Sequence, residues 1–371
     1  MHEHFRKDCV EILKERHAAG KISRRTLFQG LGLLAGTSVL GLGAGRAMAE
    51  SGQLVFVNWG GDAVTMMSEA FGEPFTRDTG VVVKYDGSGP TEGAISAQAA
   101  TGHPTWDLVD CDPFTGQALG KQGYMEEIDY SVVDPKKMRA GMQWKYASAT
   151  YLYSYVIAYS TEAYPDAAPS SMADFFDTEK FPGKRSMYKW GAGMWEAALL
   201  ADGVAPDALY PLDLDRAHAK IAAFKDNVAA FWGGGAESQT LLMDGDVTMA
   251  LIWSTRGKVL HEDTDGEITF VWDQGILAPG STGVLKNNPG GKDLAMKFIA
   301  ASQAPERQAK LFELMANGPA NPEADALIPA GLKQFNPADP ANAAKQIPLD
   351  MEWYEANYGA ALDAYLKVIS A

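Results

Sequence analysis

Short apolar runs alternate with segments of helical periodicity along the chain after residue 53. Residues 54–59 and 81–85 are typical of buried strands. Residues 62–79, between them, place apolar side chains three or four positions apart and end at Gly80, which predicts a helix. A helix over 92–101 and a strand at 108–109 continue the alternation. This order predicts an α/β fold with a mostly parallel sheet and helices on both faces.

The second part of the chain repeats the alternation. Residues 151–160 have a period of two, which predicts a strand with Tyr151, Tyr153, Tyr155 and Tyr159 on one side. A row of tyrosines fits a strand that borders a cleft, and it equally fits an ordinary half-buried strand. We also predict helices over 172–176, 213–224, 293–301, 306–315 and 348–369, strands over 247–253 and 268–272, a loop or hinge over 275–283, and a surface-wrapping segment over 318–339.

The N-terminal residues have the features of an export signal. Residues 23–28 contain the pair Arg24-Arg25, an apolar stretch covers 31–45, and Ala47-Met48-Ala49 forms a small-residue cleavage site. These features predict a twin-arginine (Tat) signal peptide over residues 1–49, cleaved near Ala49. The alternative is a single membrane anchor, but the apolar stretch is shorter than the ~20 residues that span a bilayer. We therefore expect a periplasmic protein.

The composition excludes several classes of function. About 320 residues remain after the signal, which favours two domains over one. The formal net charge of −15 argues against binding to nucleic-acid phosphates and favours a soluble monomer. Cys9 lies in the signal, so Cys111 has no partner for an internal disulfide. No zinc spacing and no nucleophile–base motif is present, so we expect no metal, no cofactor and no enzymatic activity.

Several short motifs occur in a characteristic order along the mature chain. They are Asn58-Trp59, residues 75–80, residues 106–109, Gly245-Asp246-Val247 with Ile252-Trp253, residues 272–275, residues 318–322 and Trp353-Tyr354. In this order the chain resembles the bacterial extracellular solute-binding proteins of the spermidine/putrescine-binding type. The resemblance implies a two-lobed periplasmic binding protein fold of type II, with a small solute in the cleft and an ABC permease as membrane partner.

The resemblance also implies a division into lobes. We expect the N-terminal lobe to contain residues 50–158 and about 279–325. We expect the C-terminal lobe to contain residues 159–278 and about 326–371. Such sites lie beyond the carboxyl ends of strands, and closure is a hinge motion around the solute.

The family pattern places one tryptophan at the end of the first strand and one at the end of the Ile-Trp strand. These match Trp59 and Trp253, whose rings suit alkyl chains and ammonium groups. The loop 88–93 leads into a helix N-terminus that offers backbone amides. The complete set of expected ligand-binding residues is Trp59, Gly60, Ser88, Glu92, Asp112, Tyr153, Tyr155, Trp190, Trp195, Trp253, Arg256 and Asp273.

The chain departs from the polyamine receptors where those carry acidic residues. Trp190, Gly193 and Gly280 occupy three positions at which a carboxylate is expected, and Glu92, Asp112, Glu196 or Asp273 would have to substitute. Arg256 follows Trp253 and is suited to grip an acid group, although a structural salt bridge is an equal alternative. The main prediction is a receptor for a polyamine such as putrescine or spermidine. The alternatives are a receptor for an ω-amino acid, aminophosphonate or carboxylate held by Arg256, and a periplasmic enzyme on the same two-lobe plan.

Overall fold

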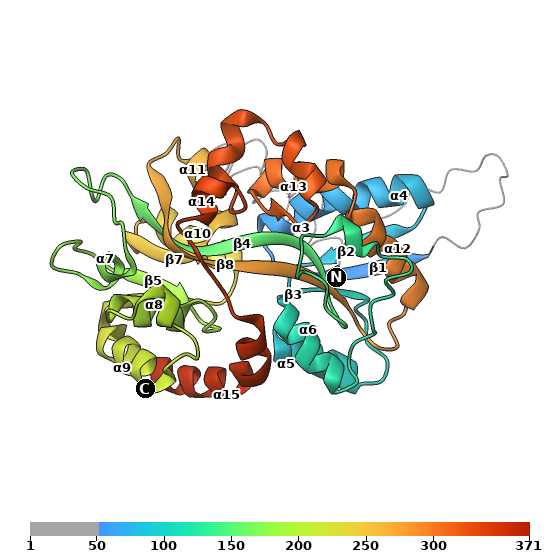
Figure 1. The fold of residues 1–371 in the computed structure, drawn as a ribbon, viewed down its shortest axis with the longest axis horizontal. Coiled ribbons are helices and arrows are strands. Elements are labelled where there is room, and N and C mark those ends of the chain that lie inside the picture. Colours follow the sequence, from blue (N-terminus) through green and yellow to red (C-terminus); the bar gives the residue numbers. More distant parts are fainter. Residues whose placement is uncertain (1–51) are drawn as a thin grey trace, which may run out of the picture. The chain divides into compact units, whose positions relative to one another are not determined.

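The computed structural model describes residues 52–371, so the predicted signal peptide and its cleavage site lie outside the described residues. A ten-stranded sheet runs through this part of the chain in the order β2-β1-β3-β8-β4-β7-β5-β6, with β9 beside β4 and β10 beside β8 (Figure 1). Its strands are β1 (Gln53–Val57), β2 (Val82–Asp86), β3 (Leu108–Cys111), β4 (Ser148–Ser160), β5 (Arg185–Tyr188), β6 (Val228–Trp232), β7 (Met249–Trp253), β8 (Ile268–Val284), β9 (Gly318–Pro319) and β10 (Ile347–Pro348).

The parallel pairs lie at the two ends of the sheet. β1 pairs with β2 and β3 at one end, and β5 pairs with β6 and β7 at the other. The two long strands β4 and β8 run antiparallel to each other between these groups. The predicted α/β fold with a mostly parallel sheet in each half is confirmed.

Helices cover both faces of the sheet, as Figure 1 shows. A π-helical segment, η1 (Ser68–Gly72), joins α3 to α4, so the predicted helix over 62–79 is one helical stretch that ends at the left-handed Gly80. The helices are α3 (Asp62–Met67), α4 (Glu73–Thr79), α5 (Glu92–Ala100), α6 (Pro113–Lys121), α7 (Met172–Phe176), α8 (Met194–Ala201), α9 (Leu214–Phe224), α10 (Gly235–Met243), α11 (Ser254–Asp263), α12 (Lys292–Ser302), α13 (Pro305–Met315), α14 (Pro340–Ala343) and α15 (Met351–Ser370). None of these helices is long and apolar enough to cross a bilayer.

Strand β8 corrects one prediction. The segment 275–283 is not a loop but the second half of this strand, and only a local bulge interrupts the pairing. Tyr155 lies opposite Ile276 and Ile157 lies opposite Val271, so four residues of β8 face Val156 alone. Gln274 in this bulge has a left-handed φ of 57°. The glycines that suggested a loop therefore belong to a bulged strand.

For the tyrosine strand β4, the sequence left open whether it borders a cleft or is an ordinary half-buried strand. Every residue from Ser148 to Tyr159 is buried, on both faces of the strand.

The segment 318–339 was predicted to wrap the surface, but it begins inside the protein. Ala320 and Asn321 are fully buried, and Asn321 donates to the carbonyl of Gln303 and accepts from the amide of Glu323.

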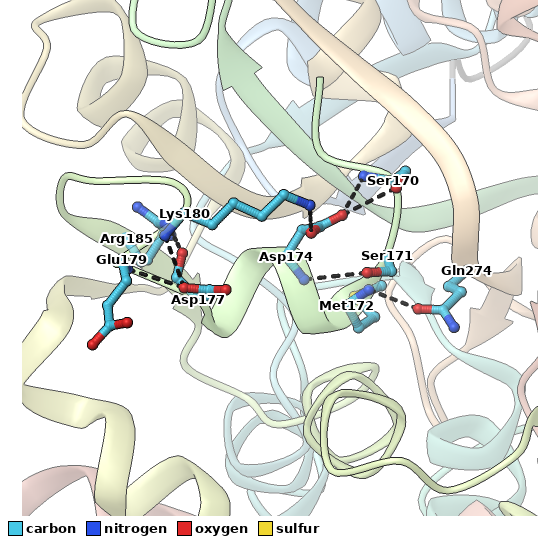
Figure 2. A network of polar contacts seen from close by, with 9 residues as sticks. All are labelled: Ser170, Ser171, Met172, Asp174, Asp177, Glu179, Lys180, Arg185 and Gln274. Carbon is cyan, nitrogen blue, oxygen red and sulfur yellow. Dashed lines mark hydrogen bonds and ion pairs between the residues drawn. The ribbon is translucent and has the colours of Figure 1, made fainter. Parts of the chain in front are cut away.

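A polar network anchors the bulge of β8 to helix α7 (Figure 2). The Ser171 side chain caps α7 by accepting from the amide of Asp174 at 3.2 Å. Gln274 accepts from the amide of Met172 at 2.7 Å through its side-chain oxygen. The free amides of the first helical turn are thus satisfied by side chains from two elements.

Arg185 at the start of β5 organises the far side of the same network. Its guanidinium is fully buried and donates to the carbonyls of Phe175 and Gly183, each at 2.9 Å, and to the carbonyl of Phe181. It also donates to the hydroxyl of Tyr164 at 3.3 Å. One side chain therefore satisfies several carbonyls of the loop between α7 and β5.

We predict that Arg185→Met lowers the free energy of unfolding by at least about 2 kcal/mol, because each buried carbonyl that loses its donor costs about 1–3 kcal/mol. Urea unfolding followed by circular dichroism measures this change. The matched control is Arg216→Met on the exposed face of α9, where the partner is Asp202 and the expected loss is below about 1 kcal/mol. Equal losses in the two variants would contradict the structural role of Arg185.

Candidate functional site

The carboxyl ends of four strands from both groups of the sheet meet at one cavity. Trp59 follows β1, Asp112 follows β3, Tyr188 ends β5 and Trp253 ends β7. The cavity is partly open and contains about 520 Å³ of empty space, which includes space open to solvent. Its walls are formed by Trp59, Ala63, Met67, Asp110, Cys111, Asp112, Tyr151, Tyr153, Tyr188, Trp253, Thr255, Arg256, Gly280, Met315 and Asn317.

Aromatic rings form one wall of this cavity. The Trp253 ring makes edge-to-face contacts with Trp59 at 5.8 Å and with Tyr188 at 5.3 Å between ring centroids. Tyr153 contacts the same indole at 6.4 Å. Trp59 is half-buried, whereas Trp253 is 7% exposed. The strand ends thus bring together two tryptophans and two tyrosines that offer apolar area and polar tips.

Arg256 contributes a buried cation to the cavity. It lies in the first turn of α11, is 1% exposed, and donates from Nη2 to the carbonyl of Gly60 at 2.9 Å. Its Nε and Nη1 are buried without a hydrogen-bond partner. Burial lowers the pKa of Arg256, while the negative charges of Asp62 and Asp110 oppose that shift. A guanidinium nevertheless stays protonated, so the cavity holds a positive charge with unused donors.

Gly235 at the start of α10 makes room for this guanidinium. A Cβ atom at Gly235 would lie 2.3 Å from Arg256 Nε and 2.7 Å from Cζ. The guanidinium therefore packs directly on the backbone of α10. No side chain larger than hydrogen fits there without moving Arg256.

Two carboxylates, the buried Asp110 and the half-buried Asp112, lie at the end of β3. Asp110 Oδ1 accepts from the Tyr151 hydroxyl, and Asp112 Oδ1 accepts from the Tyr153 hydroxyl, both at 2.7 Å. Burial raises the pKa of Asp110 to about 7 and that of Asp112 to about 6. The hydrogen bonds from the two tyrosines oppose these shifts by stabilising the charged forms.

Tyrosine rings fill the space at two of the three positions where the resemblance implies a carboxylate. Gly280 pairs with Tyr151 across β8 and β4, and a Cβ at Gly280 would lie 2.3 Å from the Tyr151 ring. Gly193 has a left-handed φ of 78°, and its Cβ would lie 2.5 Å from the Tyr155 ring. An acidic side chain at either position therefore clashes with a buried ring.

A second, partly open cavity adjoins the first and shares Trp59, Cys111, Asp112 and Tyr188 with it. The expected residues Glu92 and Trp190 line this outer cavity. Burial raises the pKa of Glu92, and the nearby charge of Asp363 adds to the shift. The rest of its wall comes from α5, α6 and α15, with Pro90, Thr91, Gly93, Ala94, Ser96, Thr115, Tyr358, Gly359, Leu362 and Asp363.

The twelve expected residues thus fall into four groups, one of which is the pair Glu92 and Trp190 in the outer cavity. Trp59, Asp112, Tyr153, Trp253 and Arg256 line the inner cavity. Gly60 and Tyr155 lie directly behind it, since Gly60 accepts from Arg256 and the Tyr155 hydroxyl lies 3.3 Å from that of Tyr153.

The remaining expected residues lie elsewhere. Ser88 is exposed and its amide donates to Asp86. Trp195 is fully buried in the core, where its indole donates to His218 at 3.0 Å. Asp273 lies on the surface and pairs with Lys345 at 3.2 Å. Glu196, considered as a substitute carboxylate, is buried and accepts from Tyr210 and Tyr354. We therefore leave these four residues out of the proposed site.

Sequence reasoning did not include several cavity residues. Asp110 is not among the expected ligand-binding residues, and its hydrogen bond with Tyr151 depends on contacts across the sheet. Tyr188 ends β5, a strand too short to stand out in the sequence. Asn317 follows α13 and enters the cavity through the packing of that helix; its Oδ1 is buried without a partner.

The family model for bacterial extracellular solute-binding proteins matches residues 70–345. The chain belongs to this family. A gamma-aminobutyric acid-binding protein of Pseudomonas aeruginosa is 31% identical over 328 residues, which are 85% of this chain and 91% of that protein. The spermidine/putrescine-binding periplasmic protein of Escherichia coli is 23% identical over 280 residues, which are 72% of this chain and 77% of that protein.

Solved structures agree with this assignment. An ABC transporter substrate-binding protein from Bradyrhizobium japonicum is 35% identical, with a TM-score of 0.78 over 86% of this chain and 99% of that chain. A GABA receptor is 34% identical, with a TM-score of 0.76 over 85% and 97%. A periplasmic binding protein of A. tumefaciens in complex with glucopine is 27% identical, with a TM-score of 0.81 over 85% and 99%. This solute-binding protein is therefore a substrate-binding protein of an ABC transporter with the two-lobed fold, and its family is periplasmic.

We predict that Gly235→Ala weakens solute binding by about tenfold or more, because the new methyl group displaces the Arg256 guanidinium, whose hydrogen bonds to a charged partner are each worth about 1.5–3 kcal/mol. Isothermal titration calorimetry with a solute that the wild-type protein binds measures the change. Gly331→Ala is the matched control, since a Cβ there meets no atom within 4 Å. Unchanged affinity in Gly235→Ala would contradict the packing requirement.

Proposed function

We propose that this solute-binding protein captures a small solute with an acid group, of the ω-amino acid class, and delivers it to its ABC permease. The observation that carries the proposal is the buried Arg256 in the cavity wall, with two donor nitrogens that have no protein partner. A carboxylate binds a guanidinium through two parallel hydrogen bonds. Such a ligand supplies an acceptor for Nη1, one of the two nitrogens that lack a partner.

A polyamine fits this cavity less well, so the main prediction from the sequence has less support than its alternative. A polyamine carries only ammonium groups, and a buried guanidinium repels them in a medium of low dielectric. Two of the positions where a carboxylate was expected are glycines covered by tyrosine rings. Among the relatives, the gamma-aminobutyric acid-binding protein is also more similar to this chain than the polyamine receptor.

Capture follows from closure of two lobes around the solute. We place the lobes at residues 50–158 with about 279–325, and at 159–278 with about 326–371. Two of the three crossings fall inside β4 and β8, so at these points the chain changes lobe within paired strands; the third lies near residue 325. Closure then requires bending of these strands, and the protein acts as a monomer that releases the solute unchanged.

We predict that Arg256→Met weakens binding of 4-aminobutanoate by about 30-fold or more, because loss of one partner from a buried charge pair costs about 2–5 kcal/mol. Titration calorimetry with 4-aminobutanoate and with putrescine measures both affinities, and chromatography of the recovered solute tests for turnover.

The control for this experiment is Arg77→Met, which makes the same change on the exposed end of α4 and should leave the affinity unaltered. Tight binding of putrescine that Arg256→Met does not weaken would overturn the proposal in favour of a polyamine receptor. Chemical conversion of the solute would indicate an enzyme.

For export, we predict that wild-type protein is recovered from the periplasm with Glu50 as its first residue, as measured by intact mass. The double change Arg24→Lys with Arg25→Lys should leave the precursor in the cytoplasm, because the arginine pair marks the Tat route. Lys21→Ala, which removes a basic residue outside the pair, is the control. Periplasmic recovery of the double variant would refute Tat export.

A further inference from the structure

The inner cavity holds charges of both signs on separate elements. Arg256 comes from α11, whereas Asp110 and Asp112 come from the end of β3. Arg256 donates its hydrogen bond to the carbonyl of Gly60 and not to either carboxylate. Arg256 therefore does not form a structural ion pair with Asp110 or Asp112, and each of these groups can bind another partner.

The two carboxylates are fixed in position without being neutralised. The Tyr151 and Tyr153 hydroxyls hold Oδ1 of Asp110 and of Asp112, and neither contact uses Oδ2. A hydroxyl donor stabilises a carboxylate but brings no positive charge. Both aspartates line the cavity, so a cationic group there gains two negative partners that are already desolvated and oriented.

Tyrosine rings exclude the carboxylates that the resemblance implies at residues 193 and 280. The Tyr151 ring that covers Gly280 is the same ring whose hydroxyl binds Asp110. The cavity therefore has no carboxylate at residues 193 and 280 but has two at the end of β3, Asp110 and Asp112. Asn317 adds a third acceptor, because its buried Oδ1 has no hydrogen-bond partner and the residue lines the same cavity.

We propose that Asp110 and Asp112 form an ammonium subsite in the cavity that holds Arg256, so that the protein selects solutes with an acid at one end and a protonated amine at the other. This inference rests on the proposed function, since Arg256 is taken to hold the acid group. It assigns recognition of the amine to Asp110 in β3 and to Asp112, which directly follows β3.

The subsite has a pH dependence whose sign follows from its surroundings. The groups that act on the two aspartates, besides each other, are Tyr85, Cys111, Tyr151, Tyr153, Tyr155, Tyr188, Arg256 and Tyr358. Only the charged carboxylates attract an ammonium group, and their pKa values are about 7 and about 6. Each carboxylate is half protonated when the pH equals its pKa, so amine recognition weakens as the pH falls through 7 and then through 6. A bound ammonium lowers both pKa values, so binding at pH 6.5 releases protons.

The test compares each of the ω-amino acids from three to six carbons with the alkanoate of the same length, by titration calorimetry at pH 8.0 and 5.5. For the best-bound length at pH 8.0, we expect the amino acid to bind about tenfold to a hundredfold tighter than its alkanoate. This ratio should shrink at pH 5.5. It should also shrink at pH 8.0 in Asp110→Asn and in Asp112→Asn, while Asp273→Asn, on the surface, retains it.

The wild-type measurements do not depend on whether the variants fold, and thermal unfolding checks each variant. A ratio near one in the wild-type protein at pH 8.0, or a ratio that survives in both folded variants, would overturn the ammonium subsite. Failure of the proposed function gives a different result: no member of either series binds, or Arg256→Met binds the solute with the affinity of the wild-type protein.

Discussion

The antiparallel pairing of β4 with β8 is the constraint on which the rest of the molecule depends. These two strands carry the chain between the parallel groups β2-β1-β3 and β7-β5-β6, and they form part of a single hydrogen-bonded sheet with both. The ends of β1, β3, β5 and β7 meet beside them at the inner cavity, which Tyr151 and Tyr153 of β4 also line. A cavity with walls from both groups is the direct outcome of this register.

Buried charge is the second constraint. Arg256 is almost fully buried with two unused donors, and Asp110 is buried with a raised pKa. Such groups cost stability, since an unpaired polar group loses its hydration without replacement. Proteins keep such arrangements at binding sites, where the missing partner is the ligand. The aromatic wall around Trp253 supplies the apolar burial that offsets part of the cost.

The sequence predicted the features that depend on local periodicity. The helices over 62–79 and 172–176, and Gly80 at the end of the first of them, are where the periodicity placed them, whereas Trp59 and Trp253 were placed at strand ends by the family resemblance. It could not predict β8 as one strand, because a bulge of four residues opposite Val156 has no local signature. Tyr151 and Gly280 contact each other but lie far apart in the chain. The sequence therefore could not show that the Tyr151 ring fills the space beside Gly280.

The contact between Tyr151 and Gly280 restricts the order in which substitutions can alter this cavity. A carboxylate side chain can enter at residue 280 only after residue 151 has lost its ring, because the two would otherwise occupy the same space. Shrinking Tyr151 first removes the hydroxyl that binds Asp110. An evolutionary path from this cavity to one with an acid on β8 must therefore pass through an intermediate. That intermediate has an empty space in the cavity wall, and its Asp110 lacks the hydrogen bond from residue 151. Substitutions at residues 151 and 280 therefore depend on each other.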